Sequence, residues 1–346
     1  MKLSLYTFAA LTFILLVGGF VYILELGEYR LDMINIMLPV AIWVVLPLIL
    51  LFLFTVVHIL FYGMRNYFQI KKWKKATVAL EDALYWSLVN EPKEQKYAIE
   101  EIGSSAVLLG KASIDVSDNI EGLTPRLTRV VNIIQKIKNG EYIDLKEHKM
   151  AKVFKPGNPI LIQNRLNRIE SDKAFVEDVM RATSDYSEMV QKEALKVFAR
   201  KTDFETARKY AKVFDVKNFL VMLERVNNED NLGLNSEILT DFVNALELHC
   251  ADYIKVAVIT KKYFKPDENL ILFRSYQAND EKAQNAYLYL LFEYELLDQA
   301  SNYLDEQEKS EFVKFRALKA LKQEHNTFRL EDIIDINSIC NETRPY

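Results

Sequence analysis

The side chains best suited to metal binding and covalent catalysis are scattered through this chain. They are His58, His148, His249, His325, Cys250 and Cys340. A zinc site usually appears as pairs of such ligands a few residues apart, and no such spacing occurs here. His249 and Cys250 are adjacent, but neighbours on a helix point about 100° apart and cannot form a nucleophile–base pair. We therefore predict no catalytic residue and no metal ligand.

Two acidic loops have the composition of calcium sites but not the spacing. A calcium-binding loop of the EF-hand type needs glycine at its sixth position and a bidentate Glu at its twelfth. Placing Gly233 sixth puts Leu239 twelfth, and placing Gly122 sixth puts Thr128 there. The sequence also lacks the GxxxxGK[ST], GxGxxG and HExxH patterns. It predicts no cofactor and argues against an enzyme with a recognisable motif.

The elements that would position any functional residue begin with two apolar runs, Leu3–Leu24 and Ile36–Tyr62. At 1.5 Å per residue the first spans roughly 33 Å, which matches a bilayer core of about 30 Å. The second carries only Thr55 and His58 as polar side chains and is long enough to cross with some tilt. A cleaved signal peptide is the alternative for the first run, but no small-x-small cleavage pattern precedes Glu25.

Charge on either side of the second run predicts the topology. The segment after it, here called the basic juxtamembrane segment, consists of Arg65, Lys71, Lys72, Trp73, Lys74 and Lys75. The short loop between the runs carries Glu25, Glu28, Arg30 and Asp32. Positive charge stays in the cytosol, so we expect a multi-pass inner-membrane protein with both termini and most of the chain cytoplasmic. We expect the basic segment to bind anionic lipid headgroups.

The part of the chain after residue 75 has the opposite charge. Residues 76–346 have a net charge of −8, from 37 Lys/Arg and 45 Asp/Glu, whereas residues 1–75 have +4. An acidic domain without basic stripes argues against nucleic-acid binding and is compatible with protein partners. Because this part is expected in the cytosol, we predict that Cys250 and Cys340 are reduced.

Few glycines and prolines interrupt the sequence beyond residue 160, which predicts an all-α fold. We expect a transmembrane hairpin over 1–75, a helical connecting subdomain over 76–155 and a helical-repeat domain over 156–346. Asn158 and Pro159 suit the start of a helix, and Thr202 to Glu205 form a capping-box pattern.

Helix pairs in the last domain are expected near residues 187, 216, 251 and 281, a period of roughly 30 to 36. This spacing predicts an α-solenoid, with an irregular helical bundle as the alternative. Leu291, Ala300 and Leu304 fit part of a tetratricopeptide (TPR) repeat, whereas the Trp, Gly and closing Pro of that pattern are missing.

Aromatic side chains cluster within this domain. Tyr287, Tyr289, Phe292 and Tyr294 fall within eight residues, and amphipathic rings are enriched at protein interfaces. They are the candidate partner surface, with packing in the core as the competing interpretation.

Two apolar runs followed by an acidic helical domain resemble, in layout, small bacterial inner-membrane accessory proteins. Some such proteins assist envelope machines including flagellar motors, and others are TPR-bearing adaptors that present membrane clients to proteases. The resemblance covers architecture and composition, and it implies no particular site residue.

Three function classes follow from these observations. The first is a membrane-anchored scaffold, adaptor or chaperone that recruits a protein partner, including a membrane complex such as the flagellar motor. The second is an enzyme without a recognisable motif. The third is a subunit of an oligomeric channel or transporter, and homo-oligomerisation is left open.

Overall fold

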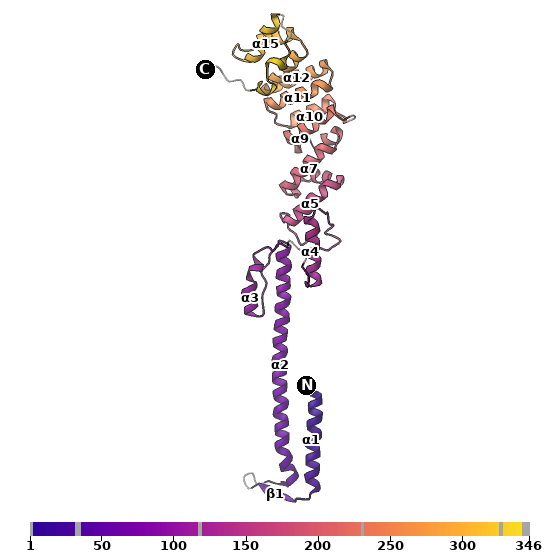
Figure 1. Cartoon of the computed structure of the whole chain (residues 1–346), viewed down its shortest axis with the longest axis vertical. Helices are drawn as coiled ribbons and strands as arrows, with labels where there is room; N and C mark the ends of the chain where they lie inside the picture. The colour runs from indigo at the N-terminus through magenta and orange to yellow at the C-terminus, as the bar shows by residue number, and fades with distance from the viewer. Residues whose placement is uncertain (1–2, 32–35, 117–119, 230–231, 325–327, 341–346) are drawn as a thin grey trace. The chain divides into compact units, whose positions relative to one another are not determined.

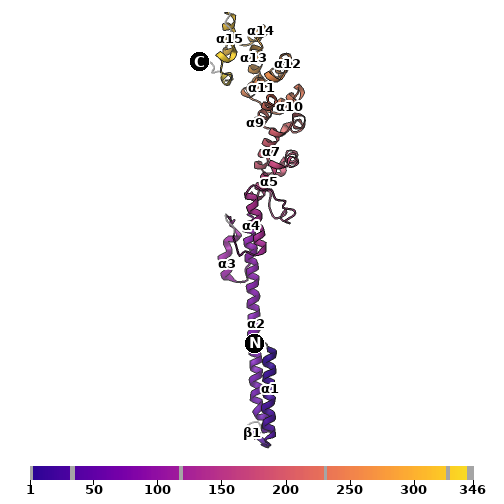
Figure 2. The same ribbon diagram turned by 45° about the vertical axis from the view of Figure 1, so that its right-hand side comes forward.

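The computed structural model describes all residues except 1–2, 32–35, 117–119, 230–231, 325–327 and 341–346, so His325 and Asp32 lie outside it. The chain is 72% helix and 2% strand, which confirms the all-α prediction. Its contacts divide it into two compact units, Met1–Val131 and Asn132–Tyr346. Figures 1 and 2 show the path of the chain.

The first unit begins with a helical hairpin. Helix α1 (Leu3–Ile23) packs along α2 (Val40–Leu88), and both are long and apolar enough to cross a membrane. Strands β1 (Glu28–Leu31) and β2 (Ile36–Pro39) pair antiparallel at the turn. The second apolar run therefore becomes helical at Val40, four residues later than expected, because Ile36–Pro39 forms strand hydrogen bonds. Pro39 precedes the helix, and Pro47 lies within it.

Two close contacts fix the hairpin. The indole Nε1 of Trp43 donates to the carbonyl of Tyr29 at 3.1 Å, which ties α2 to β1. A Cβ atom added at Gly18 would lie 2.9 Å from Cγ2 of Val45, so only glycine fits without a shift. At the neighbouring Gly19 no atom lies within 4 Å of such a Cβ. Gly18 thus provides the close approach between helices that small residues allow in membranes.

Helix α2 continues far beyond a bilayer. Its 49 residues span about 74 Å, against about 30 Å for the hydrocarbon core. Helix α3 (Glu100–Ala106) and the 3₁₀ turn η1 (Val107–Gly110) pack on the later part of α2, as Figure 1 shows.

Polar contacts attach the following chain to the end of α2. The Ser87 hydroxyl donates to the carbonyl of Ala112 at 2.5 Å, and the Ile114 amide donates to the carbonyl of Ser87 at 3.2 Å. At the start of α4 (Pro125–Lys138), Arg126 donates to Asp82 at 2.6 Å. Its guanidinium also lies 4.4 Å from the centre of the Tyr85 ring.

The second unit is a series of short helices joined by turns. After α4 these are α5 (Pro159–Ser171), α6 (Lys173–Arg181), α7 (Glu188–Lys201), α8 (Phe204–Arg208), α9 (Val216–Glu224), α10 (Ser236–Ala245), α11 (Cys250–Tyr263), α12 (Pro266–Asn279), α13 (Gln284–Glu293), α14 (Leu297–Asp305), α15 (Val313–Gln323) and α16 (Leu330–Ile333). Helices α5, α7, α9, α11 and α13 each pack on the next in the series. Helices α8, α10 and α12 form a second run of neighbours, and one hydrophobic core extends from Ile169 to Ile339.

Short polar side chains start several of these helices. The Asn158 side chain accepts from the amide of Ile160 at 2.9 Å, which confirms the predicted cap of α5. The capping box predicted from Thr202 is wrong by one residue. The amide of Thr202 still donates to the carbonyl of Phe198, so Thr202 ends α7, and Asp203 caps α8.

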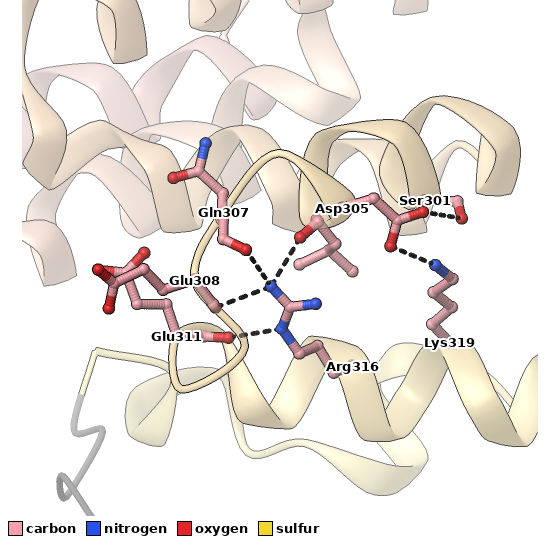
Figure 3. A network of polar contacts seen from close by, with 8 residues as sticks. Ser301, Asp305, Gln307, Glu308, Glu311, Arg316 and Lys319 are labelled. Atoms are coloured by element: carbon pink, nitrogen blue, oxygen red, sulfur yellow. Dashed lines mark hydrogen bonds and ion pairs between the residues drawn. The ribbon is translucent and has the colours of Figure 1, made fainter.

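A single guanidinium organises the chain between α14 and α15. Arg316 donates to the carbonyls of Leu304 (2.6 Å), Gln307 (3.1 Å), Glu308 (2.9 Å) and Glu311 (2.9 Å), as Figure 3 shows. The last carbonyls of a helix lack partners within it, and Arg316 supplies one for Leu304, near the end of α14. Lys319 also donates to Asp305 at 3.2 Å.

The end of the described chain folds back onto α11 and is joined to it covalently. A disulfide links Cys250, the first residue of α11, to Cys340, 90 residues later, with the Cα atoms 5.9 Å apart. The prediction of two reduced cysteines is therefore wrong for this structure. Cys250 and Cys340 are too far apart in sequence for their spacing to indicate pairing. Leu330, Ile334 and Ile339 of this segment are buried and belong to the hydrophobic core of the second unit.

The two hairpin glycines give a matched test. We expect Gly18→Ala to lower the free energy of unfolding of the hairpin in bicelles by about 1 to 3 kcal/mol relative to Gly19→Ala, because only Gly18 faces Val45. Both variants add the same methyl group to adjacent positions of one helix. Equal stabilities would show that the close contact contributes nothing.

Reduction of the disulfide tests the anchoring of the C-terminal segment. In the chain-entropy model, a link across 90 residues stabilises by about 4 to 5 kcal/mol. We expect dithiothreitol to lower hydrogen-exchange protection of residues 330–340 in the wild-type chain. The variant Cys340→Ser should show the lower protection with or without dithiothreitol. Unchanged protection of the reduced wild-type chain would show that burial of Leu330 and Ile334 suffices.

Candidate functional site

The basic juxtamembrane segment lies on α2 and is open to solvent. Arg65, Lys71, Lys72, Trp73, Lys74 and Lys75 are all exposed, and the Trp73 side chain is 58% exposed. The five cations occupy eleven consecutive positions, so they extend over about 15 Å of helix. An exposed tryptophan among lysines beside a membrane helix is typical of the interface between hydrocarbon and water.

The predicted aromatic surface lies mostly in the core. Tyr289 and Phe292 are 0% and 2% exposed, Tyr287 is buried, and only Tyr294 is half-buried. All residues from Ala286 to Phe292 are buried because α13 is covered on several sides, including by α11 and α12. The clustered rings fill the domain interior and do not form an exposed groove. Burial also raises the pKa of Tyr289 to about 12.

A half-buried ion pair joins α11 to α13. Lys261 donates to the carboxylate of Glu293, and its ammonium lies 4.0 Å from Glu331 on α16. Burial opposes protonation of Lys261, but the hydrogen bonds and charge interactions with Glu293 and Tyr289 together outweigh it, so the pKa of Lys261 is raised. Lys261 is therefore a cation that holds three elements together.

The histidines are separated in the structure as in the sequence. His58 lies beside Tyr62, with ring centres 4.4 Å apart, and His249 is exposed at the start of α11. Within the described ranges, no three His, Cys, Asp or Glu side chains gather as metal ligands.

The second unit contains a pocket with charged residues in its lining, which sequence reasoning missed. A cavity of about 320 Å³ lies between α5, the preceding irregular segment 142–156, Phe175 of α6 and Tyr186 before α7. Its charged lining consists of Lys146, Arg165, Arg168 and Asp144. We call it the Arg165 pocket.

Buried asparagines fix the wall of this pocket. Asn164, which is 3% exposed, accepts from the amide of Ile143 and donates to its carbonyl, both at 2.9 Å. Asn167 donates to the carbonyls of Ile137 (2.7 Å) and Glu141 (2.9 Å). These side chains replace the regular hydrogen bonds that the irregular segment lacks. These four hydrogen bonds hold the backbone beside the pocket in place.

The two arginines of the pocket differ in their partners. Arg168 donates to Asp172 at 2.8 Å and lies 4.4 Å from the centre of the Phe175 ring. The amide of Phe175 and the guanidinium of Arg168 both lower the pKa of Asp172, so this carboxylate stays ionised and neutralises Arg168.

Arg165 has no such counterion among the described residues. Its guanidinium lies 4.8 Å from the centre of the Tyr186 ring. Its Nη1 is shielded from solvent and donates to no acceptor in the part of the chain that the structure describes. A buried donor left unpaired costs about 1 to 3 kcal/mol, more when charged, and arginine cannot lose its proton to avoid this cost.

The sequence does contain a signal for this pocket. Residues 136–168 hold eight Lys/Arg and three Asp/Glu, a net charge of +5 within a chain of net charge −4. Summing charge over all of residues 76–346 hides this basic stretch. The burial of one arginine in it depends on the packing of α5 against α6 and α7, which periodicity does not reveal.

Comparison with known proteins adds no assignment to these sites. No family model, no curated protein and no solved structure matches the chain.

Proposed function

We propose that this protein is a membrane-anchored adaptor or scaffold that recruits a protein partner at the cytosolic face of a bacterial inner membrane. The observation that carries the proposal is the continuity of α2, whose 49 residues pass from an apolar stretch into an exposed basic one and then into water-soluble structure. The chain thus combines a membrane element with a large helical region in one polypeptide.

We propose that the second unit is a degenerate α-solenoid. The successive packing of α5, α7, α9, α11 and α13, with α8, α10 and α12 as a second run, supports this arrangement. The helices of the first run start at residues 188, 216, 250 and 284 after α5, close to the expected period. Solenoids offer extended surfaces that suit protein recruitment, and an accessory role in an envelope machine such as the flagellar motor fits this proposal.

We propose that this unit is cytoplasmic. Five cations follow α2, while the loop before it carries one cation and three carboxylates. Disulfides, in contrast, are rare in the cytosol and common outside it, so the Cys250–Cys340 link favours the opposite orientation. Charge acts during membrane insertion, before the second unit folds, and this order of events supports the cytoplasmic orientation.

Protease accessibility tests the orientation. We expect protease added outside intact cells to leave the second unit uncut. Replacing Lys71, Lys72, Lys74 and Lys75 by Gln should expose the unit to the protease in part of the population. Replacing the exposed Lys209, Lys212, Lys217 and Lys262 by Gln is the matched control. External cleavage of the wild-type unit would refute the cytosolic orientation.

Recruitment is tested by crosslinking in the native membrane. We expect mild amine crosslinking followed by detergent purification of the full chain to recover a partner in fixed stoichiometry. When the crosslinker is added only after the membrane has been dissolved in detergent, a weakly bound partner should be lost and a permanently bound partner should be retained. Recovery of the chain alone, as a monomer, would contradict an adaptor. A closed homo-oligomer would favour the channel alternative.

A further inference from the structure

We propose that the Arg165 pocket binds an acidic side chain of a partner protein, with Arg165 as its counterion. The inference rests on the proposed adaptor function and names the chemistry of the partner. The pocket is separate from the membrane hairpin and from the Lys261 ion pair, and all its lining residues belong to the second unit.

The charge balance of the pocket favours an anion. Its lining contains three cations and one carboxylate, and the nearby Asp172 is already held by Arg168. The remaining carboxylate, Asp144, is exposed and accepts from the backbone amide of Lys146 at 2.8 Å. Two positive charges, those of Arg165 and of the exposed Lys146, are therefore left without a described counterion beside an open cavity.

Because Nη1 of Arg165 has no described partner, the pocket favours a ligand that carries a hydrogen-bond acceptor. Nη1 is shielded from solvent, so a carboxylate or phosphate in the cavity accepts from it only once the guanidinium turns toward the cavity. Such charge-assisted bonds are stronger than neutral ones. A neutral apolar ligand would leave Nη1 unpaired. The Tyr142 and Tyr186 rings at the pocket accommodate the carbon part of a side chain.

The surroundings favour a peptide segment with several acidic residues over a single small anion. Lys146, Lys149 and Lys152 are exposed on the irregular segment that forms one wall. Neighbouring carboxylates of an extended acidic peptide would face these lysines, whereas a small anion would use only the pocket. Complementary charge of this kind mainly sets specificity and the association rate.

The test uses the full-length protein in detergent and three fluorescent peptides of equal length. One peptide contains a run of Glu, the second has Gln in its place, and the third has phosphoserine. We expect anisotropy titrations to show binding of the Glu or the phosphoserine peptide, weakened by salt, and no binding of the Gln peptide. The stronger of the two acidic peptides identifies the source of the anion.

Two variants test whether the acidic peptide binds in the Arg165 pocket. We expect Arg165→Gln to raise the dissociation constant about tenfold or more, while its circular dichroism and thermal midpoint stay close to wild type because an unpaired donor is removed. Arg181→Gln is the matched control, since Arg181 is exposed on α6 and pairs only with Asp178, at 3.9 Å. Equal affinity of the wild-type and Arg165→Gln proteins, or equal binding of the Glu and Gln peptides, would overturn the proposal.

Crosslinking of the partner to the wild-type and Arg165→Gln proteins tests the pocket proposal separately from the proposed adaptor function. A partner that crosslinks equally to wild-type and Arg165→Gln protein would leave recruitment intact and refute the pocket as its site. Loss of that partner in the Arg165→Gln variant alone would support both.

Discussion

The backbone hydrogen bonding of α2, in which Pro47 alone among the helix residues supplies no amide donor, is the constraint on which the first unit depends. Inside a bilayer every amide and carbonyl needs a partner, and a helix supplies these partners within one segment. The same helix continues without a break through the basic juxtamembrane segment to Leu88. What changes along it is only the side-chain surface, from exposed leucines to exposed lysines and then to buried Ala76 and Ala83.

The second unit is governed by a different constraint, the satisfaction of helix ends and irregular segments. Asp172, Asp203, Asp215 and Asn235 each accept from a backbone amide at the start of a helix. Arg225 and Arg316 donate to carbonyls at the other ends, with Arg225 reaching those of Ala199 and Thr202. Short helices have a high proportion of terminal backbone groups without partners inside the helix. The side chains that pair with these groups therefore stabilise the second unit together with its apolar core.

The sequence predicted the features that depend on local pattern. Apolar length located both hairpin helices, and the Asn158–Pro159 pair located the start of α5. It did not predict features that depend on contacts between distant residues. The Cys250–Cys340 link spans 90 positions, and the burial of Tyr289 and Phe292 depends on helices that cover α13. An aromatic cluster has the same composition whether it faces a partner or the core, so only packing distinguishes the two.

The comparison of the two pocket arginines shows why burial and charge must be considered together. Arg165 and Arg168 lie three residues apart on one helix, and both stack on aromatic rings. Asp172 caps α6 and is also the counterion of Arg168, so the local fold requires Arg168 whether or not a ligand binds. No described contact gives Arg165 an equivalent structural role beyond the Tyr186 ring. An unneutralised guanidinium in a fixed cavity lowers stability unless an anion completes it, and this asymmetry distinguishes a binding residue from a folding residue.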